Sequence, residues 1–306
     1  MAKKDIASYI RHPSKLIVFL GTRGFMRWMS DATYLKIAYK ACIGRKLDLN
    51  QPKSYTEKLQ WLKLNYRKKE FTMMADKADV KRFVADKIGE EHVIPTYGVW
   101  ERFDDINFDE LPSQFVLKCT HDSGSVVICK DKSKLDIPSA RKKLEYGLKK
   151  RPYDNAREWV YKDIKPRIIA EKYMQSENSE SLNDYKLFCF DGQVKMLFVA
   201  ANRNISGKEL TFDFFDDDLQ HLPFLNGHPN DNGDSIRCPS EFEKMKEYAG
   251  ILSQGIPHVR VDFYEINGEV YFGEMTFYHN GGIVPFEPDE WDYRIGEWLE
   301  LPRKIN

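Results

Sequence analysis

The apolar residues of this chain follow two different periods, and the alternation between them predicts helices mixed with short strands. Short apolar runs bounded by turn residues predict strands, whereas apolar residues three or four apart predict helices. The predicted strands cover residues 93–100, 115–120, 126–129, 167–174, 185–190, 194–201, 209–215 and both arms of 258–278. The predicted helices cover residues 14–47, 76–89, 138–150, 155–162, 240–255 and 287–301, and another opens with the capping-box pattern of Ser54 and Glu57. This order predicts an α+β chain with mainly antiparallel strands.

Residues 258–278 carry the most informative of these patterns, because two apolar strands flank the turn pair Asn267-Gly268. Arg260, Asp262 and Glu274 interrupt these strands, although unpaired charge within a packed strand is costly. One interpretation is that the three side chains converge to hold Mg²⁺ and a polyphosphate. The alternative is a surface hairpin whose charges point to water, and the hairpin alone leaves both open.

The geometry of the turn decides whether these three charged groups face the same way. Side chains alternate along a strand, so with a two-residue loop Glu274 would face away from Asp262. A three-residue loop, residues 266–268, would place all three groups on one face, and Gly268 suits the left-handed position of such a loop. We therefore predict a three-residue loop or a bulge with the same effect.

Charge is balanced over the whole chain, with 47 basic and 47 acidic residues, but it is unevenly distributed. Residues 1–70 hold 16 basic and 5 acidic residues, whereas residues 204–306 hold 8 basic and 20 acidic residues. A basic N-terminal region suggests an anionic partner, either a membrane surface or an acidic polymer. An equally good explanation is a solvated helix surface that balances the acidic C-terminal part.

Cysteine spacing and hydropathy bear on the cellular compartment. The five cysteines lack metal-binding spacing and are expected to be reduced thiols in a cytoplasmic protein. The apolar run 16–20 is too short to span a membrane. Because basic residues surround it, a helix that rests on a membrane surface is one interpretation. We therefore expect a cytoplasmic protein, with peripheral association at the inner face of the membrane as an option.

Two further strands also place charge among apolar residues. Lys118 lies between Leu117 and Cys119, and the small-residue turn 120–125 follows it. Backbone N–H groups of such a turn can close over phosphates, although a plain hairpin turn has the same composition. Asp184 and Lys186 share one face of their strand, where an exposed ion pair is the alternative explanation.

Taken in order, these motifs resemble the ATP-grasp superfamily, and their order is similar to that of D-alanine–D-alanine ligases. Within the superfamily, the chain resembles the teichuronopeptide-biosynthesis (TupA-like) ATP-grasp family over roughly residues 30 to 300. The segments that carry this resemblance are Gln51-Pro-Lys-Ser-Tyr-Thr-Glu-Lys-Leu-Gln-Trp61, Phe115-Val-Leu-Lys118, Asp184-Tyr-Lys186 and Gly273-Glu-Met-Thr-Phe-Tyr278.

The resemblance implies an ATP-grasp fold, in which two α+β lobes clasp ATP, preceded by a helical basic extension. It implies four segments: the basic region 1–70, a first ATP-grasp segment 71–112, a small lobe with phosphate loop and adenine hinge 113–182, and a C-terminal lobe with the metal site 183–306.

The resemblance also assigns roles to residues that bind the nucleotide. Lys77 and Lys118 match the two phosphate-binding lysines, and Glu171 matches the residue that holds the adenine amino group. Asp184, with Lys186 beside it, matches the acidic residue that binds the ribose hydroxyls. The phosphate-covering loop matches Ser123, Gly124, Ser125 and Val126, and the hinge that reads the adenine edge matches Lys172, Tyr173 and Met174.

The metal and catalytic positions follow from the same resemblance. Asp262 and Glu274 match the Mg²⁺ carboxylates, and Thr276 stands where the ligases have an asparagine ligand. Asn280 or water are alternatives for that third ligand, since Mg²⁺ often keeps water. Arg260 matches the arginine that steadies the transferred phosphate. Arg203 is a candidate for anion contact or an ordinary strand-end arginine, and His121 and His279 are candidate bases or loop histidines without a catalytic role.

The activity implied is ATP-dependent, ADP-forming ligation of a carboxylate to an amine through an acyl phosphate. The family suggests capsular or other cell-surface polysaccharide synthesis, with an acidic glycan or sugar-linked carboxylate and an amine donor as partners, and no nucleic acid. A glycan kinase would use the same ATP site. A glycosyltransferase is a third option, because the acidic run 216–218 resembles a metal motif of sugar-nucleotide enzymes, although a solvated turn explains it better.

Overall fold

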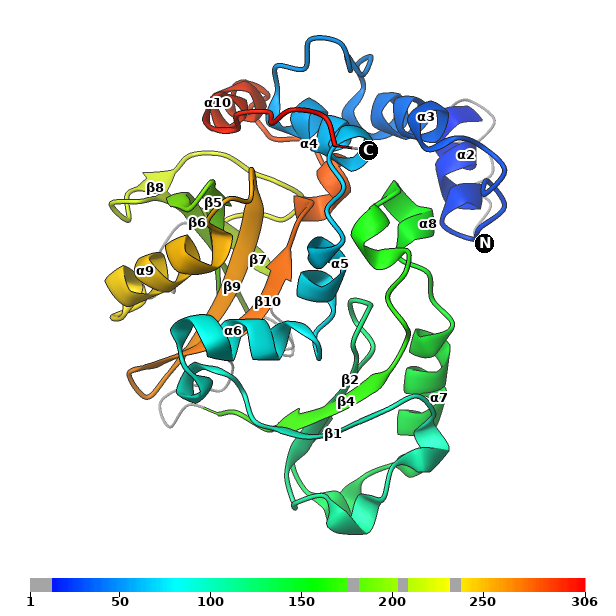
Figure 1. Ribbon diagram of the computed structural model, residues 1–306, viewed down its shortest axis with the longest axis vertical. Helices are drawn as coiled ribbons and strands as arrows, with labels where there is room; N and C mark the ends of the chain where they lie inside the picture. Colours follow the sequence, from blue (N-terminus) through cyan, green and yellow to red (C-terminus); the bar gives the residue numbers. More distant parts are fainter. Residues whose placement is uncertain (1–12, 176–181, 203–208, 232–237, 306) are drawn as a thin grey trace.

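Two antiparallel sheets, each with its own helices, dominate the computed structural model (Figure 1). The structure describes residues 13–175, 182–202, 209–231 and 238–305. The smaller sheet has the strand order β1-β4-β2-β3, formed by Thr96–Trp100, Ile168–Lys172, Phe115–Cys119 and Val126–Cys129. The α+β class predicted from the sequence is confirmed.

The larger sheet has the strand order β10-β9-β5-β6-β7-β8. Its strands are Glu269–Thr276, Val259–Ile266, Asp184–Phe190, Gln193–Ala201, Thr211–Asp216 and His221–Leu222. All residues of β5 are buried, which explains why this strand lacks the apolar–polar alternation of a half-exposed strand. Between β5 and β6 lies the tight turn predicted at Asp191-Gly192, both in the left-handed region.

The hairpin of β9 and β10 combines a two-residue turn with a bulge. Ile266 pairs with Glu269, so the loop is Asn267-Gly268, with φ of 54° and 83° as a type I′ turn requires. The pairing shifts by one residue at Gly273, and Glu274 consequently lies directly opposite Asp262. The three-residue loop is therefore wrong, and the bulge with the same effect is confirmed.

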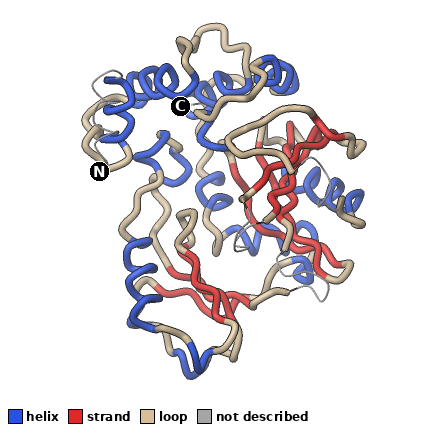
Figure 2. Tube along the Cα trace, turned by 180° about the vertical axis from the view of Figure 1, so that it is seen from behind, coloured by secondary structure: helices blue, strands red, loops and turns tan. Residues whose placement is uncertain are grey.

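Each sheet has its own apolar core. The helix α9 (Phe242–Ser253) packs on the larger sheet, and α7 (Ile137–Leu148) packs on the smaller one. Buried residues of the larger sheet join those of α4 (Tyr55–Asn65), α5 (Glu70–Ala75) and α6 (Val80–Ile88) in one cluster. A separate cluster lies under the smaller sheet. Two cores define the two lobes, and Figure 2 shows them from behind.

The helices that open the chain pack at one end of the molecule. α2 (Pro13–Gly21) contacts α3 (Asp31–Ile43) and α8 (Tyr153–Ala156). α4 begins with the predicted capping box: the Ser54 Oγ accepts from the Glu57 N–H at 3.3 Å, and the Glu57 carboxylate accepts from the Ser54 N–H at 3.1 Å. Such reciprocal capping satisfies two orphan donors of the first turn.

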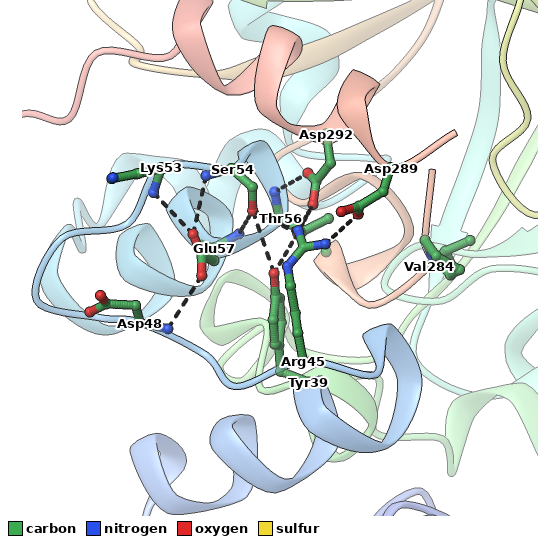
Figure 3. Close-up of polar contacts among 12 residues, drawn as sticks. Tyr39, Arg45, Asp48, Lys53, Ser54, Thr56, Glu57, Val284, Asp289 and Asp292 are labelled. Atoms are coloured by element: carbon green, nitrogen blue, oxygen red, sulfur yellow. Dashed lines mark hydrogen bonds and ion pairs between the residues drawn. The ribbon is translucent and has the colours of Figure 1, made fainter. Parts of the chain in front are cut away.

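A buried charged network joins this region to the last helix, α10 (Glu290–Trp298) (Figure 3). The Asp292 carboxylate accepts hydrogen bonds from the Thr56 N–H at 2.8 Å and the Thr56 hydroxyl at 2.5 Å. Arg45 forms ion pairs with the same carboxylate and with Asp289. The loop between α3 and α4 is thereby fixed to the C-terminal end of the chain.

Three predicted helices differ from those observed. The helix predicted over 14–47 is split, because the non-helical residues 22–30 separate α2 from α3. The helix predicted over 155–162 is replaced by α8 and a 3₁₀ turn at Trp159–Tyr161, because Arg157 takes a left-handed conformation with φ of 52° between them. The helix predicted to begin at residue 76 begins at Val80, since the Asp76 carboxylate accepts hydrogen bonds from the N–H groups of residues 78 and 79.

Among the residues described, no helix is long and apolar enough to cross a bilayer.

Candidate active site

A row of charged side chains crosses three strands of the larger sheet. Asp262 on the middle strand pairs in register with Lys186 on one side and with Glu274 on the other. The Lys186 ammonium forms an ion pair with Asp262 and lies 3.7 Å from the Asp184 carboxylate. Two carboxylates directly opposite one another repel unless cations compensate them. The row therefore depends on its positive members.

Arg260 is the second cation of this row. Its guanidinium grips the Asp262 carboxylate with two hydrogen bonds of 2.7 and 2.8 Å, the fork geometry that suits Arg and carboxylates. The Nη2 group also donates to the Thr276 hydroxyl at 3.0 Å and lies 3.5 Å from Glu274. Arg260, Asp262, Glu274 and Thr276 thus come together as the sequence predicted.

His279 holds the other end of the Arg260 guanidinium. Its Nδ1 lies 2.9 Å from the Arg260 Nη1, which can only donate, so Nδ1 accepts and Nε2 carries the proton. That Nε2–H donates to the Asn226 Oδ1 at 2.9 Å. Burial first, and the Arg260 charge second, lower the pKa of His279 well below its usual value. His279 is therefore a neutral group that orients Arg260 rather than a free base.

Lys77 connects the two lobes. Its backbone N–H donates to the Thr120 carbonyl at 3.1 Å, and its ammonium donates to the Asp122 carbonyl at 3.0 Å, both in the turn after β2. The same ammonium lies 3.3 Å from the Glu274 carboxylate on β10. The first lysine predicted for phosphate binding thus lies between the phosphate-loop candidate and the carboxylate pair.

The charge on Glu274 follows from these neighbours. Its burial would raise the pKa, but the positive charges of Lys77, Lys186 and Arg260 outweigh this effect and hold the pKa well below the usual range. Its side chain is 34% exposed, against 3% for Asp262. Glu274 is therefore an ionised carboxylate that solvent can reach.

On the smaller sheet, Glu171 is clamped by two lysines. Its Oε2 lies 2.5 Å from the Lys118 ammonium, and its Oε1 lies 2.6 Å from the Lys81 ammonium. Burial would raise the pKa of Glu171, but the charges of the two lysines outweigh burial, so the pKa is lowered. Both carboxylate oxygens therefore already have charged partners, so the adenine contact expected for Glu171 stays a prediction that competes with a lysine-holding role.

The turn after β2 is partly exposed and partly anchored. Ser123 and Gly124 are exposed, and Gly124 has φ of 91°. Ser125 is buried, and its hydroxyl donates to the Asp122 carboxylate at 2.6 Å, while Lys150 binds both groups. The Ser125 hydroxyl thus fixes the base of the turn, which leaves Ser123, Gly124 and the half-buried Val126 as the segment that a phosphate could meet.

His121 has the contacts of a loop anchor. It is 2% exposed, and its Nε2 lies 3.2 Å from the Lys150 carbonyl, so that nitrogen donates. Burial lowers the pKa of His121. A catalytic role for this histidine stays a prediction, and so does that of Arg203, which lies outside the described residues.

The remaining nucleotide candidates lie along two strands. Asp184 is buried, and its charge, ahead of burial, raises the pKa of Tyr264 well above the usual value. Lys172 is exposed, and Tyr173 and Met174 are half-buried at the end of β4. The Lys172 N–H donates to the Pro95 carbonyl at 2.9 Å, which fixes the start of the predicted hinge.

The donor set fits a magnesium ion that also uses phosphate oxygens. Asp262 and Glu274 are directly opposite carboxylates, and Mg²⁺ is commonly bound through one or two carboxylates plus substrate phosphates. Within the described parts of the chain, no three His, Cys, Asp or Glu side chains gather as a metal site of their own. The Thr276 hydroxyl accepts from Arg260, and the Asn280 amide donates to Asn226, so neither is established as the third ligand.

The sequence did not single out three residues near this site. Lys81 follows Lys77 by four residues in the helix predicted over 76–89, a spacing that would have suggested it. Asn226, which accepts a hydrogen bond from His279, lies in a loop and carries no sequence signal. Glu158 is half-buried beside Gly281: a Cβ added to Gly281 would come within 3.4 Å of the Glu158 Oε1. Burial raises the pKa of Glu158, although the charges of Lys63 and Arg260 oppose this effect.

Two α+β lobes, with lysines between them and an Arg-x-Asp and glutamate row on the larger sheet, have the architecture of the ATP-grasp ligases. The chain belongs to the TupA-like ATP-grasp family: the family model described as "TupA-like ATPgrasp" matches residues 57–300. No curated protein matches the chain.

Solved structures with ATP-grasp folds are similar at low identity. D-alanine–D-alanine ligase from Bacillus anthracis complexed with ATP is 17% identical, with a TM-score of 0.38, over 67% of this chain and 54% of that one. The corresponding ligase from Helicobacter pylori is 15% identical, with a TM-score of 0.40, over 81% and 69%. L-amino acid ligase from Bacillus licheniformis is 13% identical, with a TM-score of 0.43, over 84% and 55%. The chain thus spans little more than half the length of the first of these ligases.

Proposed function

We propose that this protein is an ATP- and Mg²⁺-dependent, ADP-forming ligase that joins a carboxylate to an amine through an acyl phosphate. The observation that carries the proposal is the charged row of Lys186, Asp262 and Glu274 with Arg260, linked by Lys77 to the turn after β2. Membership of the TupA-like ATP-grasp family supports the proposal independently.

In the first step, a carboxylate oxygen of the acceptor attacks the γ-phosphorus of ATP, and the bond to the bridging oxygen breaks to release ADP. Lys77 and Lys118 would neutralise phosphate oxygens, and Arg260 would stabilise the charge that develops on the transferred phosphoryl group. Mg²⁺, when held by Asp262 and Glu274, would supply further charge neutralisation on the phosphates.

In the second step, an amine attacks the acyl carbon, a C–N bond forms, and inorganic phosphate leaves while the amine loses a proton. Arg260 is suited to hold the leaving phosphate, because His279 and Asp262 fix its guanidinium in one orientation. The protein itself need form no covalent bond, because holding the two substrates in the reactive geometry is sufficient for a large rate enhancement.

We further propose an acidic substrate, a uronic-acid-type carboxylate on a capsular or other cell-surface polysaccharide or its precursor, with an amino acid or amine as the second substrate. The basic N-terminal region, with 16 basic and 5 acidic residues in 1–70, supports a negatively charged acceptor. The five cysteines are free thiols, which supports a reducing, cytoplasmic location.

The test is incubation with ATP, MgCl₂, uronic-acid oligosaccharides and amino acids, followed by measurement of ADP and mass spectrometry of the products. ADP release with amide formation supports the ligase, whereas a stable phosphorylated sugar would make the protein a kinase. Glu274→Gln should abolish ADP release while circular dichroism stays unchanged. Glu269→Gln on the same strand, 61% exposed and 3.8 Å from Lys244, is the matched control and should keep full turnover.

A glycosyltransferase receives less support from the acidic run 216–218. The Asp216 carboxylate accepts hydrogen bonds from the N–H groups of Asp218 and Gln220 at 3.0 and 2.8 Å, and residues 217 and 218 are exposed. These are the contacts of a solvated turn. Stabilisation by a UDP-sugar and not by ATP with Mg²⁺ in a thermal-shift assay would favour the glycosyltransferase nonetheless.

A further inference from the structure

The N-terminal helices present an apolar surface that the rest of the described chain leaves uncovered. Trp28 is 78% exposed, more than any other large apolar side chain described, and Phe25 is 64% exposed three residues earlier. Leu16 on α2 is 38% exposed. These three exposed apolar side chains lie in one short segment, and we treat them as one candidate patch, because exposed apolar surface marks interaction sites.

Helix α2 itself is only partly covered. Its apolar residues 17–20 are all half-buried, and Gly21 is its sole buried residue among those whose side chains are described. Gly21 packs so closely on Tyr34 that an added Cβ would lie 2.1 Å from the hydroxyl oxygen. The helix is therefore fixed to α3 along one line and keeps apolar surface in contact with water.

The segment that carries this patch contains basic residues and no acidic ones. Residues 6–30 contain four arginines or lysines and no aspartate or glutamate. Arg27 is used within the protein, where it pairs with Asp154 at 2.6 Å. Arg23 is exposed and forms no ion pair within the described ranges, and its guanidinium lies 3.6 Å from the centre of the Phe19 ring. One cation is thus available to an outside partner beside the apolar residues.

We infer that this patch, defined by Leu16, Arg23, Phe25 and Trp28, docks the protein on an anionic lipid bilayer. Aromatic residues with basic neighbours are the composition of interfacial membrane anchors, and anionic lipids add attraction for each basic residue. Figure 1 places α2 at the outer edge of the molecule, beyond α8 and away from both sheets, so docking would leave the ATP site free.

A bilayer fits this surface better than a polysaccharide does. Aromatic rings can stack on sugars, but the aliphatic surface of α2 gains nothing from a hydroxyl-rich chain, whereas it gains from transfer out of water into the acyl boundary. A second copy of the protein would bring the same positive charge to the interface, which opposes pairing. None of the patch residues belongs to the proposed ATP site, so docking on a bilayer does not depend on which reaction the protein catalyses.

Flotation with phosphatidylglycerol-containing vesicles, and with pure phosphatidylcholine vesicles, tests the inference. We expect binding to the anionic vesicles only, weakened by salt. Phe25→Ser with Trp28→Ser should lower the partition coefficient on the order of tenfold, and Arg23→Ser about fivefold. Tyr146→Ser on α7, at a residue 68% exposed, is the matched control and should bind like the parent.

Four results would overturn the inference. The first two are absence of binding to anionic vesicles and binding that the double serine variant retains. The third is a dimer in light scattering that the double variant loses, because then a second copy covers the patch. The fourth is equal binding of a soluble polyuronate through the same residues, which would assign the patch to a glycan. An unchanged thermal shift with ATP in each variant shows that the fold and the proposed nucleotide site are intact.

Discussion

Replacement of Glu171 by glutamine separates two roles that this residue can have. The change keeps the shape of the side chain and removes its charge. In the structure, its two oxygens lie 2.5 and 2.6 Å from the ammonium groups of Lys118 and Lys81, and Glu171 is 4% exposed. Without the carboxylate, two neighbouring cations would share one neutral amide.

The size of the effect follows from burial. Removing one partner of a buried ion pair typically costs about 3–5 kcal/mol. The side chains of Lys118 and Lys81 are 16% and 15% exposed, so both ammonium groups can regain part of their hydration. We therefore expect a loss of about 2 kcal/mol in the free energy of unfolding, which lowers Tm by roughly 5 °C in a protein of this size.

Nucleotide binding then distinguishes the roles in a thermal-shift assay. If Glu171 holds the lysines, a bound triphosphate supplies the missing negative charge, and ATP, GTP and tripolyphosphate should each raise Tm more in Glu171→Gln than in the parent. If Glu171 reads the adenine amino group, the variant should lose only its preference for ATP over GTP. That second pattern, or an unchanged Tm without ligand, would refute the lysine-holding role.

A matched control comes from an exposed ion pair in the same lobe. Glu101 and Lys165 form a pair whose side chains are 57% and 64% exposed. Exposed pairs contribute little to stability, so Glu101→Gln should change the free energy of unfolding by less than about 0.5 kcal/mol and leave all three ligand shifts unchanged.

Two further predictions concern stability. Arg45→Met leaves the buried Asp292 without its cation and should lower the free energy of unfolding in urea by about 3 kcal/mol. Asp289→Ala, at a side chain 59% exposed, should lower it by less than about 0.5 kcal/mol. Equal losses would contradict the network in Figure 3. Burial lowers the pKa of His258 to about 3, so the unfolded chain takes up a proton below pH 6.5 that the folded one refuses. As the pH falls below 6.5, His258 should therefore remove about 1.4 kcal/mol of stability per pH unit, or about 2 kcal/mol by pH 5, in addition to the losses from the buried His121 and His279. A His258→Gln variant with an equally steep profile would contradict this.

Most strands could be predicted from the sequence because their signal is local. The apolar run before Asp191-Gly192 and the one after it became β5 and β6, and the capping box at Ser54 formed as expected. Each of these depends on neighbours within a few residues, which the sequence displays directly. Strand alternation likewise predicts that Arg260 and Asp262 share a face, and their side chains are in contact on β9.

Other features depend on distant parts of the chain and carried no local signal. The role of Ser125 in a phosphate loop stays a prediction, but the contacts of its hydroxyl with Asp122 and Lys150 were not indicated by the sequence. The helix expected at 155–162 breaks at Arg157, whose guanidinium lies over the ring of Tyr34 at 4.2 Å from the ring centre. Helix propensity is a weak preference that such tertiary contacts override.

The bulge at Gly273 shows how one residue decides whether the charged row can exist. The two-residue turn at Asn267-Gly268 alone would put Glu274 on the face opposite to Asp262, because a shift of one residue reverses every side chain beyond it. Gly273 absorbs the extra residue where its backbone lies close to the neighbouring strand: an added Cβ would come within 3.1 Å of the Asp262 carbonyl oxygen. Glycine meets this close approach without a side chain to move. The close approach therefore favours glycine at the bulge that brings Glu274 opposite Asp262.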